Sequence, residues 1–250
     1  MTIWSAHFLN ARKTLNAVMP ETRAAVRDAV QAASEYADIP SFDLIVRSGD
    51  GIPEWGVGGM APAPGIIELT VNPARFDARL IGRTIVHELH HLIRWDGPGY
   101  GRSLGEALVS EGLAGQFVQQ VLGGTPDPWD ATVPTSGLAK RAITEWAWLD
   151  YDHALWFFGK GNIRKWAGYG LGHRLIAEHI ARNPDATAVT LATVAAEQFR
   201  PAMRRLSGSE VEDVEVEDTL ADDVPADADQ PVTDTPDDDK TLDKDTGPAA

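Results

Sequence analysis

The 250-residue sequence contains no cysteine. Disulfide bonds, thiolate metal ligands and cysteine nucleophiles are therefore excluded. The sequence also lacks an apolar run long enough to span a membrane, and its N-terminus lacks the basic region and apolar core of a secretory signal. We therefore expect a cytoplasmic protein that has no membrane partner.

Basic charge is scarce as well, since the formal net charge is -15. Residues 207–250 hold sixteen of the 37 acidic residues and only two of the 22 basic ones, which leaves a net charge of -1 for the rest of the chain. This nearly neutral body offers no basic surface for nucleic acid. The acidic segment has few large apolar residues, so burial cannot offset the entropy lost on ordering. We predict a disordered acidic tail over 207–250, either simply solvated or able to bind a basic partner.

The most informative pattern in the sequence is His-Glu-x-x-His at residues 87–91. On a helix, His87 and His91 project from the same face and can hold one metal ion, with Glu88 beside them to act on a water molecule at the metal. Apolar residues surround most of this helix, so we expect it to be buried, where unsatisfied imidazoles and carboxylates are costly. The alternative is an ordinary helix whose histidines are capped or partly exposed.

Hydrophobic periodicity and turn residues predict a small sheet followed by a mostly helical second half. We expect two helices within residues 2–37, strands at 41–47 and 65–71, a weak edge strand at 56–60, the motif helix from 75 or 77 to 95, and helices at 103–122, 168–182 and 190–199. A tryptophan-rich segment, 138–166, favours core packing over an aromatic wall that contacts substrate.

Two histidines leave a catalytic zinc site one protein ligand short. Glu106 and Glu111 are both candidates, but they lie about 140 degrees apart around a helix, so one face cannot present both. Glu106 fits the capping-box position that follows Ser103. Glu111 lies two turns into the helix among small residues that allow a neighbouring helix to approach. We therefore predict Glu111 as the third ligand.

The segment His-Glu-Leu-His-His (87–91), followed by Ser-Glu-Gly-Leu-Ala (110–114), resembles the gluzincin branch of zinc metallopeptidases. In its thermolysin-like members the second histidine and the ligand glutamate are also twenty positions apart. Together with Ala-Gly-Tyr-Gly-Leu-Gly-His (167–173), these segments resemble a bacterial family of predicted zinc-dependent proteases over most of residues 1–200. The resemblance implies a zincin-like fold, one Zn²⁺ held by His87, His91 and Glu111, and Glu88 as the general base.

Members of this branch often use a tyrosine or histidine from the second half of the domain to stabilise the oxyanion. Tyr169 is our first candidate for this role and His173 our second, since they lie four residues apart on one helix face. An ordinary buried Tyr-His pair is the alternative. His90 lies about 60 degrees from the metal-binding direction, so we expect it to contact the ligands indirectly or to face the cleft. We assign no role to His7, His153 or His179.

These observations predict a single α+β, zincin-like domain over residues 1–206 and a tail over 207–250. The predicted function is zinc-dependent hydrolysis of peptide bonds in a peptide or protein substrate, using a metal-activated water. One alternative is a non-catalytic interaction protein that has a structural zinc site and an acidic docking tail; such sites are closed by four protein ligands. Another is hydrolysis of a non-peptide amide.

Overall fold

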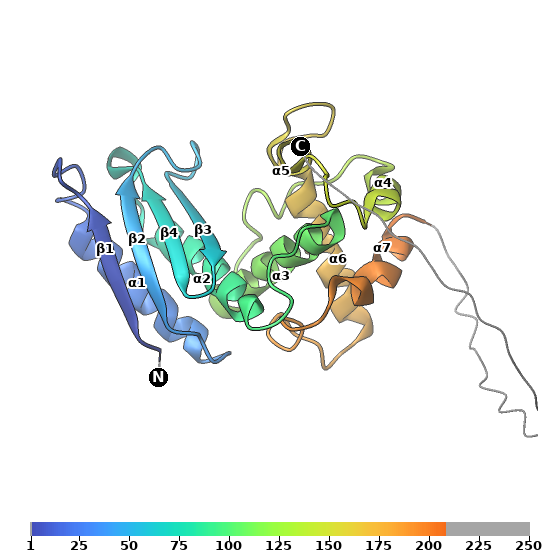
Figure 1. Ribbon diagram of the computed structural model, residues 1–250, viewed down its shortest axis with the longest axis horizontal. Coiled ribbons are helices and arrows are strands. Elements are labelled where there is room, and N and C mark those ends of the chain that lie inside the picture. Colours follow the sequence, from blue (N-terminus) through green and yellow to red (C-terminus); the bar gives the residue numbers. More distant parts are fainter. Residues whose placement is uncertain (1, 209–250) are drawn as a thin grey trace, which may run out of the picture. The chain divides into compact units, whose positions relative to one another are not determined.

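The computed structural model describes residues 2–208 and has an α+β architecture of four strands and seven α-helices in that range (Figure 1). In chain order the elements are β1 (Trp4–Leu9), α1 (Met19–Ser34), β2 (Phe42–Ser48), β3 (Val57–Ala63), β4 (Ile66–Val71), the 3-10 helix η1 (Pro73–Arg75), α2 (Ala78–Trp95), α3 (Leu104–Leu122), α4 (Leu138–Glu145), α5 (His153–Phe158), α6 (Ala167–Arg182), the 3-10 helix η2 (Ala196–Phe199) and α7 (Arg200–Leu206). The predicted α+β class is confirmed. The predicted tail, 207–250, lies outside the described residues except for its first two positions.

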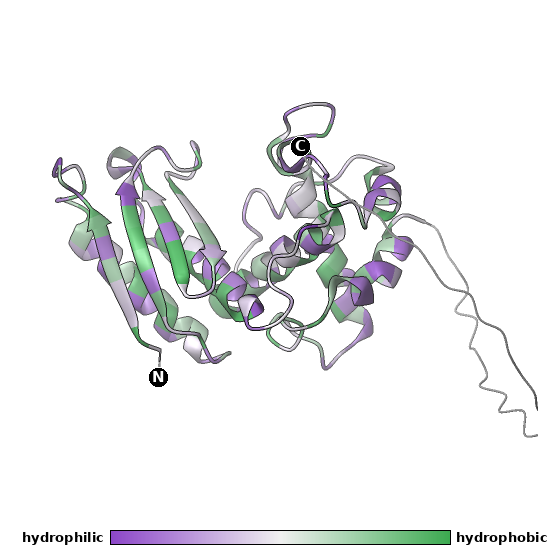
Figure 2. Ribbon diagram, viewed as in Figure 1, coloured by the Kyte–Doolittle hydropathy of each residue, from purple (hydrophilic) through white to green (hydrophobic). Residues whose placement is uncertain are grey.

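The four strands form one mixed sheet in the order β1-β2-β4-β3. β1, β2 and β4 run parallel, whereas β3 pairs antiparallel with β4 and forms the edge nearest to α2. Helices α1 and α2 cover one face of the sheet (Figure 1). Figure 2 shows apolar residues along the central strands β2 and β4, as expected for strands that contribute to a buried core. The predicted edge strand is thus β3.

The prediction of a helix in the first part of residues 2–37 is wrong, because Trp4–Leu9 forms the parallel strand β1. Along β1 half-buried and exposed residues alternate, with Trp4, Ala6 and Phe8 packed against the core. This alternation has the two-residue period of a strand. Pairing with β2 decides the conformation of so short a segment, and the sequence of the segment alone does not reveal that partner.

The helix limits around the motif follow from side-chain caps. The Asp77 carboxylate accepts hydrogen bonds from the main-chain N–H groups of Arg79 and Leu80 and begins α2. Ser103 and Glu106 form the predicted capping box at the start of α3. These caps fix where both helices begin.

The predicted helix over 190–199 is also wrong. Thr187 and Thr190 hydrogen-bond each other's main-chain N–H groups through their hydroxyls, and such local bonds compete with helical ones. Within this range only the short 3-10 helix η2 forms, and the next α-helix is α7, which has Pro201 in its first turn, where the missing N–H is harmless. None of the helices between residues 2 and 208 combines the length and hydrophobicity that a membrane span requires.

Two hydrophobic cores flank α3. One lies between the sheet, α1, α2 and the C-terminal half of α3, and the other between the N-terminal half of α3 and helices α4 to α7. α3 packs on α6 through a glycine contact: a Cβ on Gly172 would lie 2.3 Å from the carbonyl oxygen of Leu108, and one on Gly112 would lie 2.2 Å from that of Gly172. Only glycine allows this approach.

We predict that Gly172→Ala destabilises the protein by about 1–3 kcal/mol, because the added methyl group meets main-chain atoms that no side-chain rotation can move away. Gly82→Ala is the matched control. Gly82 also lies inside a helix, but a Cβ there meets nothing within 4 Å, so alanine should stabilise by about 0.5–1 kcal/mol. Urea denaturation of both variants measures the difference. Equal stabilities would contradict the close-packing argument.

Candidate metal centre

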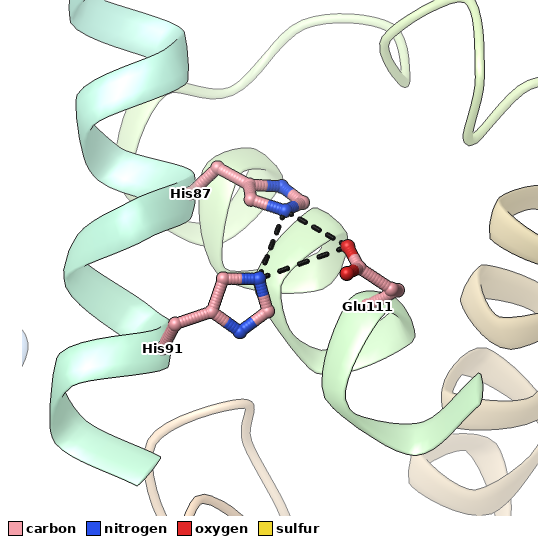
Figure 3. Close-up of side chains that lie close together, drawn as sticks. All are labelled: His87, His91 and Glu111. Carbon is pink, nitrogen blue, oxygen red and sulfur yellow. Dashed lines mark hydrogen bonds and ion pairs between the residues drawn. The ribbon is translucent and has the colours of Figure 1, made fainter. Parts of the chain in front are cut away.

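The two motif histidines and Glu111 meet where α2 packs against α3 (Figure 3). His87 Nε2 lies 3.1 Å from Glu111 Oε2 and 3.2 Å from His91 Nε2, and His91 Nε2 lies 3.7 Å from the same carboxylate oxygen. All three side chains are buried. Within the described residues, this is the group of histidine and carboxylate side chains whose geometry is suited to hold a metal ion.

The spacing of the three donor atoms fits a zinc ion. Nitrogen and oxygen ligands lie about 2.0–2.2 Å from zinc, so donors at the corners of a tetrahedron lie about 3.3–3.6 Å apart. The observed separations of 3.1, 3.2 and 3.7 Å agree with this to within a few tenths of an ångström. Three such donors would occupy three corners of a tetrahedron and leave the fourth for solvent or substrate.

Glu111 dominates the electrostatics of the group. Burial alone would lower the pKa of His87, but the hydrogen bond and charge of Glu111 outweigh it and raise that pKa to about 9. Conversely, burial would raise the pKa of Glu111, but His91 and His87 hold it well below its usual value. The carboxylate is therefore ionised at neutral pH, as a metal ligand has to be.

Tyr100, in the loop between α2 and α3, fixes the orientation of Glu111. Its hydroxyl donates a hydrogen bond of 2.7 Å to Glu111 Oε1, while Oε2 faces the histidines. The Ser110 hydroxyl in turn donates to the main-chain oxygen of Tyr100, and the buried Arg94 donates to the Ser110 oxygen. Tyr100 thus engages one carboxylate oxygen of Glu111. The other, Oε2, faces the histidines and is the single atom that Glu111 could offer to a metal ion.

Glu88 lies beside this group, buried against the edge strand β3. A Cβ on Gly59 would lie 2.6 Å from Glu88 Oε1 and 2.8 Å from Thr84 Cγ2, so the glycine makes room for the carboxylate. Burial raises the pKa of Glu88, and the nearby His87 and His91 only partly oppose this shift. A carboxylate whose pKa is raised is a stronger base than a solvated one.

A cavity of about 430 Å³ opens onto the group and is lined by Glu88 together with all three donor residues. Tyr169 from α6, Tyr100 and residues 59–62 of β3 also line it. Burial, followed by the charges of Glu111 and Glu88, raises the pKa of Tyr169 well above its usual value. Its hydroxyl therefore stays protonated and can act as a hydrogen-bond donor.

His173 is not brought to the cavity. Its Nε2 lies 2.8 Å from Oε1 of Gln119, and its Nδ1 lies 3.4 Å from Nε2 of Gln116, so both ring nitrogens face α3 side chains. Burial lowers its pKa to about 4, which keeps the ring neutral. Of the predicted Tyr169-His173 pair, only Tyr169 lies among the residues that line the cavity.

His90 and Glu106 also point elsewhere. The expectation that His90 faces the cleft or the ligands is wrong: its Nε2 lies 3.0 Å from the carbonyl oxygen of Ala188, and it packs on Phe117 in the core. Burial lowers its pKa to about 3. Glu106 accepts hydrogen bonds from Ser103 and the main chain of Arg102, as a capping residue does.

Sequence reasoning missed four residues at or near the site. Tyr100 and His153 line the cavity, and Tyr151 places its hydroxyl 3.0 Å from His153 Nδ1. Asp130 is buried against Gly115 of α3, where burial raises its pKa well above the usual value, and it interacts electrostatically with His87. These residues lie in loops or a short helix without periodicity, so no local pattern marks them. For His153, the high content of aromatic residues in 138–166 is the one sequence feature that could have indicated a place in the cavity wall.

Comparison with known protein families also points to a metal site, in agreement with the two histidines and one carboxylate of the group. Residues 19–200, well over half of the chain, match a family model described as "Predicted Zn-dependent protease (DUF2268)". The chain is also 34% identical over 71 residues to the uncharacterized protein YjfC of Bacillus subtilis (strain 168). That match covers 27% of this chain and 24% of YjfC, so the chain spans about a quarter of the length of this relative.

We predict that Glu111→Gln weakens Zn²⁺ binding by more than about a hundredfold, because even residues that only support a ligand change affinity by about 10–100-fold. Glu106→Gln is the matched control, since glutamine also serves in a capping box. Competition with a chromophoric chelator measures both affinities. The ligand assignment fails if Glu106→Gln loses the metal and Glu111→Gln retains it.

We also predict that Zn²⁺ binding strengthens with pH. In the metal-free protein His87 keeps its proton up to about pH 9, and that proton has to leave before the nitrogen can bind a metal. The apparent affinity should therefore rise about tenfold per pH unit between pH 7 and about 9 and then level off. Chelator competition at several pH values measures this slope. An affinity that is constant between pH 7 and 9 would contradict it.

Proposed function

This chain belongs to the family of predicted Zn-dependent proteases, and on that premise we propose that it hydrolyses peptide bonds with one zinc ion held by His87, His91 and Glu111. The observation that carries the proposal is the approach of the three buried donor atoms beside Glu88 at the wall of a cavity. We further propose a zincin-like fold of the gluzincin type, with residues 1–206 as the catalytic domain.

Each residue around the cavity has a distinct part in this chemistry. A bound zinc ion would polarise the scissile carbonyl of the substrate. It would also lower the pKa of its water from about 15.7 towards about 7. Glu88 accepts the proton of the attacking water and passes it to the leaving amine. Its burial against Gly59 supports this role, because desolvation raises the basicity of the carboxylate.

Tyr169 is the residue that we propose to stabilise the oxyanion of the substrate. It lines the cavity with Glu88, and its raised pKa keeps the hydroxyl as a donor. His173, the second candidate, has less support, since both ring nitrogens face glutamines of α3. Tyr100 has a different part: it holds Glu111 so that Oε2 faces the histidines.

The substrate backbone is proposed to pair with β3 around Gly56–Met60. This strand is a sheet edge, and Gly59 and Met60 line the cavity. An extended peptide can add to such an edge through main-chain hydrogen bonds. Ala61 is already engaged, since its carbonyl accepts a hydrogen bond from the Trp95 indole, so pairing beyond Met60 would have to displace that contact.

The rival function, a structural zinc site in an interaction protein, requires a fourth protein ligand. His90 on α2 and His173 on α6 could supply such a ligand only if they faced the group, and both bond to other partners. In the described part of the chain the donor group has three members, which supports the catalytic role over the structural one. A non-peptide amide as the substrate is distinguished by comparing cleavage of peptide and non-peptide amide libraries.

We predict that Glu88→Gln retains zinc but loses about 10²–10⁴-fold in kcat on peptide substrates, because the amide cannot accept the proton of water. Metal analysis and cleavage of a broad peptide library by the same preparation measure both quantities. Glu106→Gln is the control, since Glu106 contacts neither the donors nor the cavity. Full activity of the zinc-loaded Glu88→Gln protein would rule out Glu88 as the base.

A further inference from the structure

A second cavity, of about 270 Å³, adjoins the first, and Glu88 lines both. The two cavities share Gly59, His87, Glu88, Phe158 and Tyr169 as walls. They form adjacent compartments that share the proposed base as a wall residue. At about 30 Å³ per water molecule, the second compartment has room for about nine waters and thus for a large side chain.

The walls that belong to the second compartment alone are largely apolar and aromatic. Trp129 and Trp166 contribute indole rings whose centroids lie 6.2 Å apart, and Trp55 packs edge-on behind Trp129 with the ring centroids at 4.9 Å. Ile52 and Pro53 from the loop before β3 complete this part of the wall. Such a surface favours an apolar occupant.

The main chain of Trp166 is held in a strained conformation. Its φ of 68° lies in the left-handed region, which a bulky residue rarely adopts. The N–H of Trp166 donates to the carbonyl oxygen of Phe157 at 3.0 Å, and the preceding turn is so tight that a Cβ on Gly159 would lie 2.6 Å from Lys165 Cα. Strain of this kind concentrates at sites of ligand contact.

Aromatic walls can bind either an apolar group or a cation. The position of Lys165 favours an apolar group here. Its ammonium nitrogen lies 4.1 Å from the Trp166 ring centroid, so the protein's own cation already covers one indole face. The same nitrogen lies 3.6 Å from the Glu54 carboxylate, which balances the charge at this rim. A cationic substrate group would have to displace Lys165 from the indole face, and an anionic one would find the lysine already paired.

We infer that the second compartment, which we call the indole subsite, holds a large uncharged apolar side chain of the substrate next to the scissile bond. The inference rests on the proposed peptidase function, since the subsite lies directly beside Glu88. It assigns the substrate class as peptides with an aromatic or long aliphatic residue at this position. Phenylalanine and leucine are preferred, and alanine and lysine are not.

The test measures binding rather than hydrolysis. Zinc-loaded Glu88→Gln protein is titrated calorimetrically with blocked peptides Ala-Ala-X-Ala-Ala, where X is Phe, Leu, Ala or Lys. The Phe and Leu peptides should bind at least about tenfold more tightly than the Ala peptide, because burying several methylene equivalents is worth about that factor or more. The Lys peptide should bind no better than the Ala peptide.

Two variants in the same Glu88→Gln background test the named walls. Trp166→Gly removes the indole and suits the positive φ, so the fold is retained, and it should reduce the Phe-to-Ala affinity ratio about tenfold. Lys165→Ala uncovers the Trp166 face and should improve binding of the Lys peptide relative to the Ala peptide several-fold. Trp148→Gly removes an indole from an exposed position outside the cavities and should leave both ratios unchanged.

Equal binding of the Phe and Ala peptides, no binding of any of the four, or an unchanged ratio in Trp166→Gly would overturn the indole subsite. None of these results bears on catalysis. Failure of the wild-type protein to cleave any peptide, together with a preserved Phe preference in binding, would instead overturn the proposed peptidase function and leave the subsite intact.

Discussion

The burial of two imidazoles and one carboxylate at the contact between α2 and α3 is the constraint that organises this protein. Removing such groups from water is costly, and mutual hydrogen bonds offset only part of that cost. Glu111 keeps a hydrogen bond from Tyr100 on one oxygen, and its other oxygen lies near both histidines. The buried Arg94-Ser110 hydrogen bond links α2 to α3 next to Glu111.

Glycines at two helix and strand contacts make this arrangement sterically possible. Gly59 lets the sheet edge approach Glu88, and Gly112 and Gly172 let α6 approach α3 one residue away from Glu111. α6 thereby brings Tyr169 to the cavity. The two hydrophobic cores meet along α3, so the helix that provides the third donor also connects the sheet to the helical half.

The parts that the sequence predicts are those that depend on local geometry. Two helices and the faces they present are identified by the four-residue spacing of His87 and His91 and by the capping box at Ser103. The elements β2, β4 and α6 are predicted from residue composition and from the glycines and prolines that end each segment. Tyr100, Asp130 and His153 come from loops or a short helix, where only the tertiary fold determines position. β1 was missed for the same reason: its conformation depends on pairing with β2.

The donor group comes from one helical hairpin, in which His87 and Glu111 are 24 residues apart. The entropy lost on closing a loop grows only with the logarithm of its length, so the hairpin can bring its three donors together early in folding. The walls of the cleft come from other elements: Gly59 from strand β3, Tyr169 from α6, and Trp166 from the residue before α6. Bringing these walls to the donor group requires contacts between residues far apart in the sequence, which form more slowly. We therefore expect the two halves of the site to assemble separately, the donor group of the hairpin before the cleft that chooses a substrate.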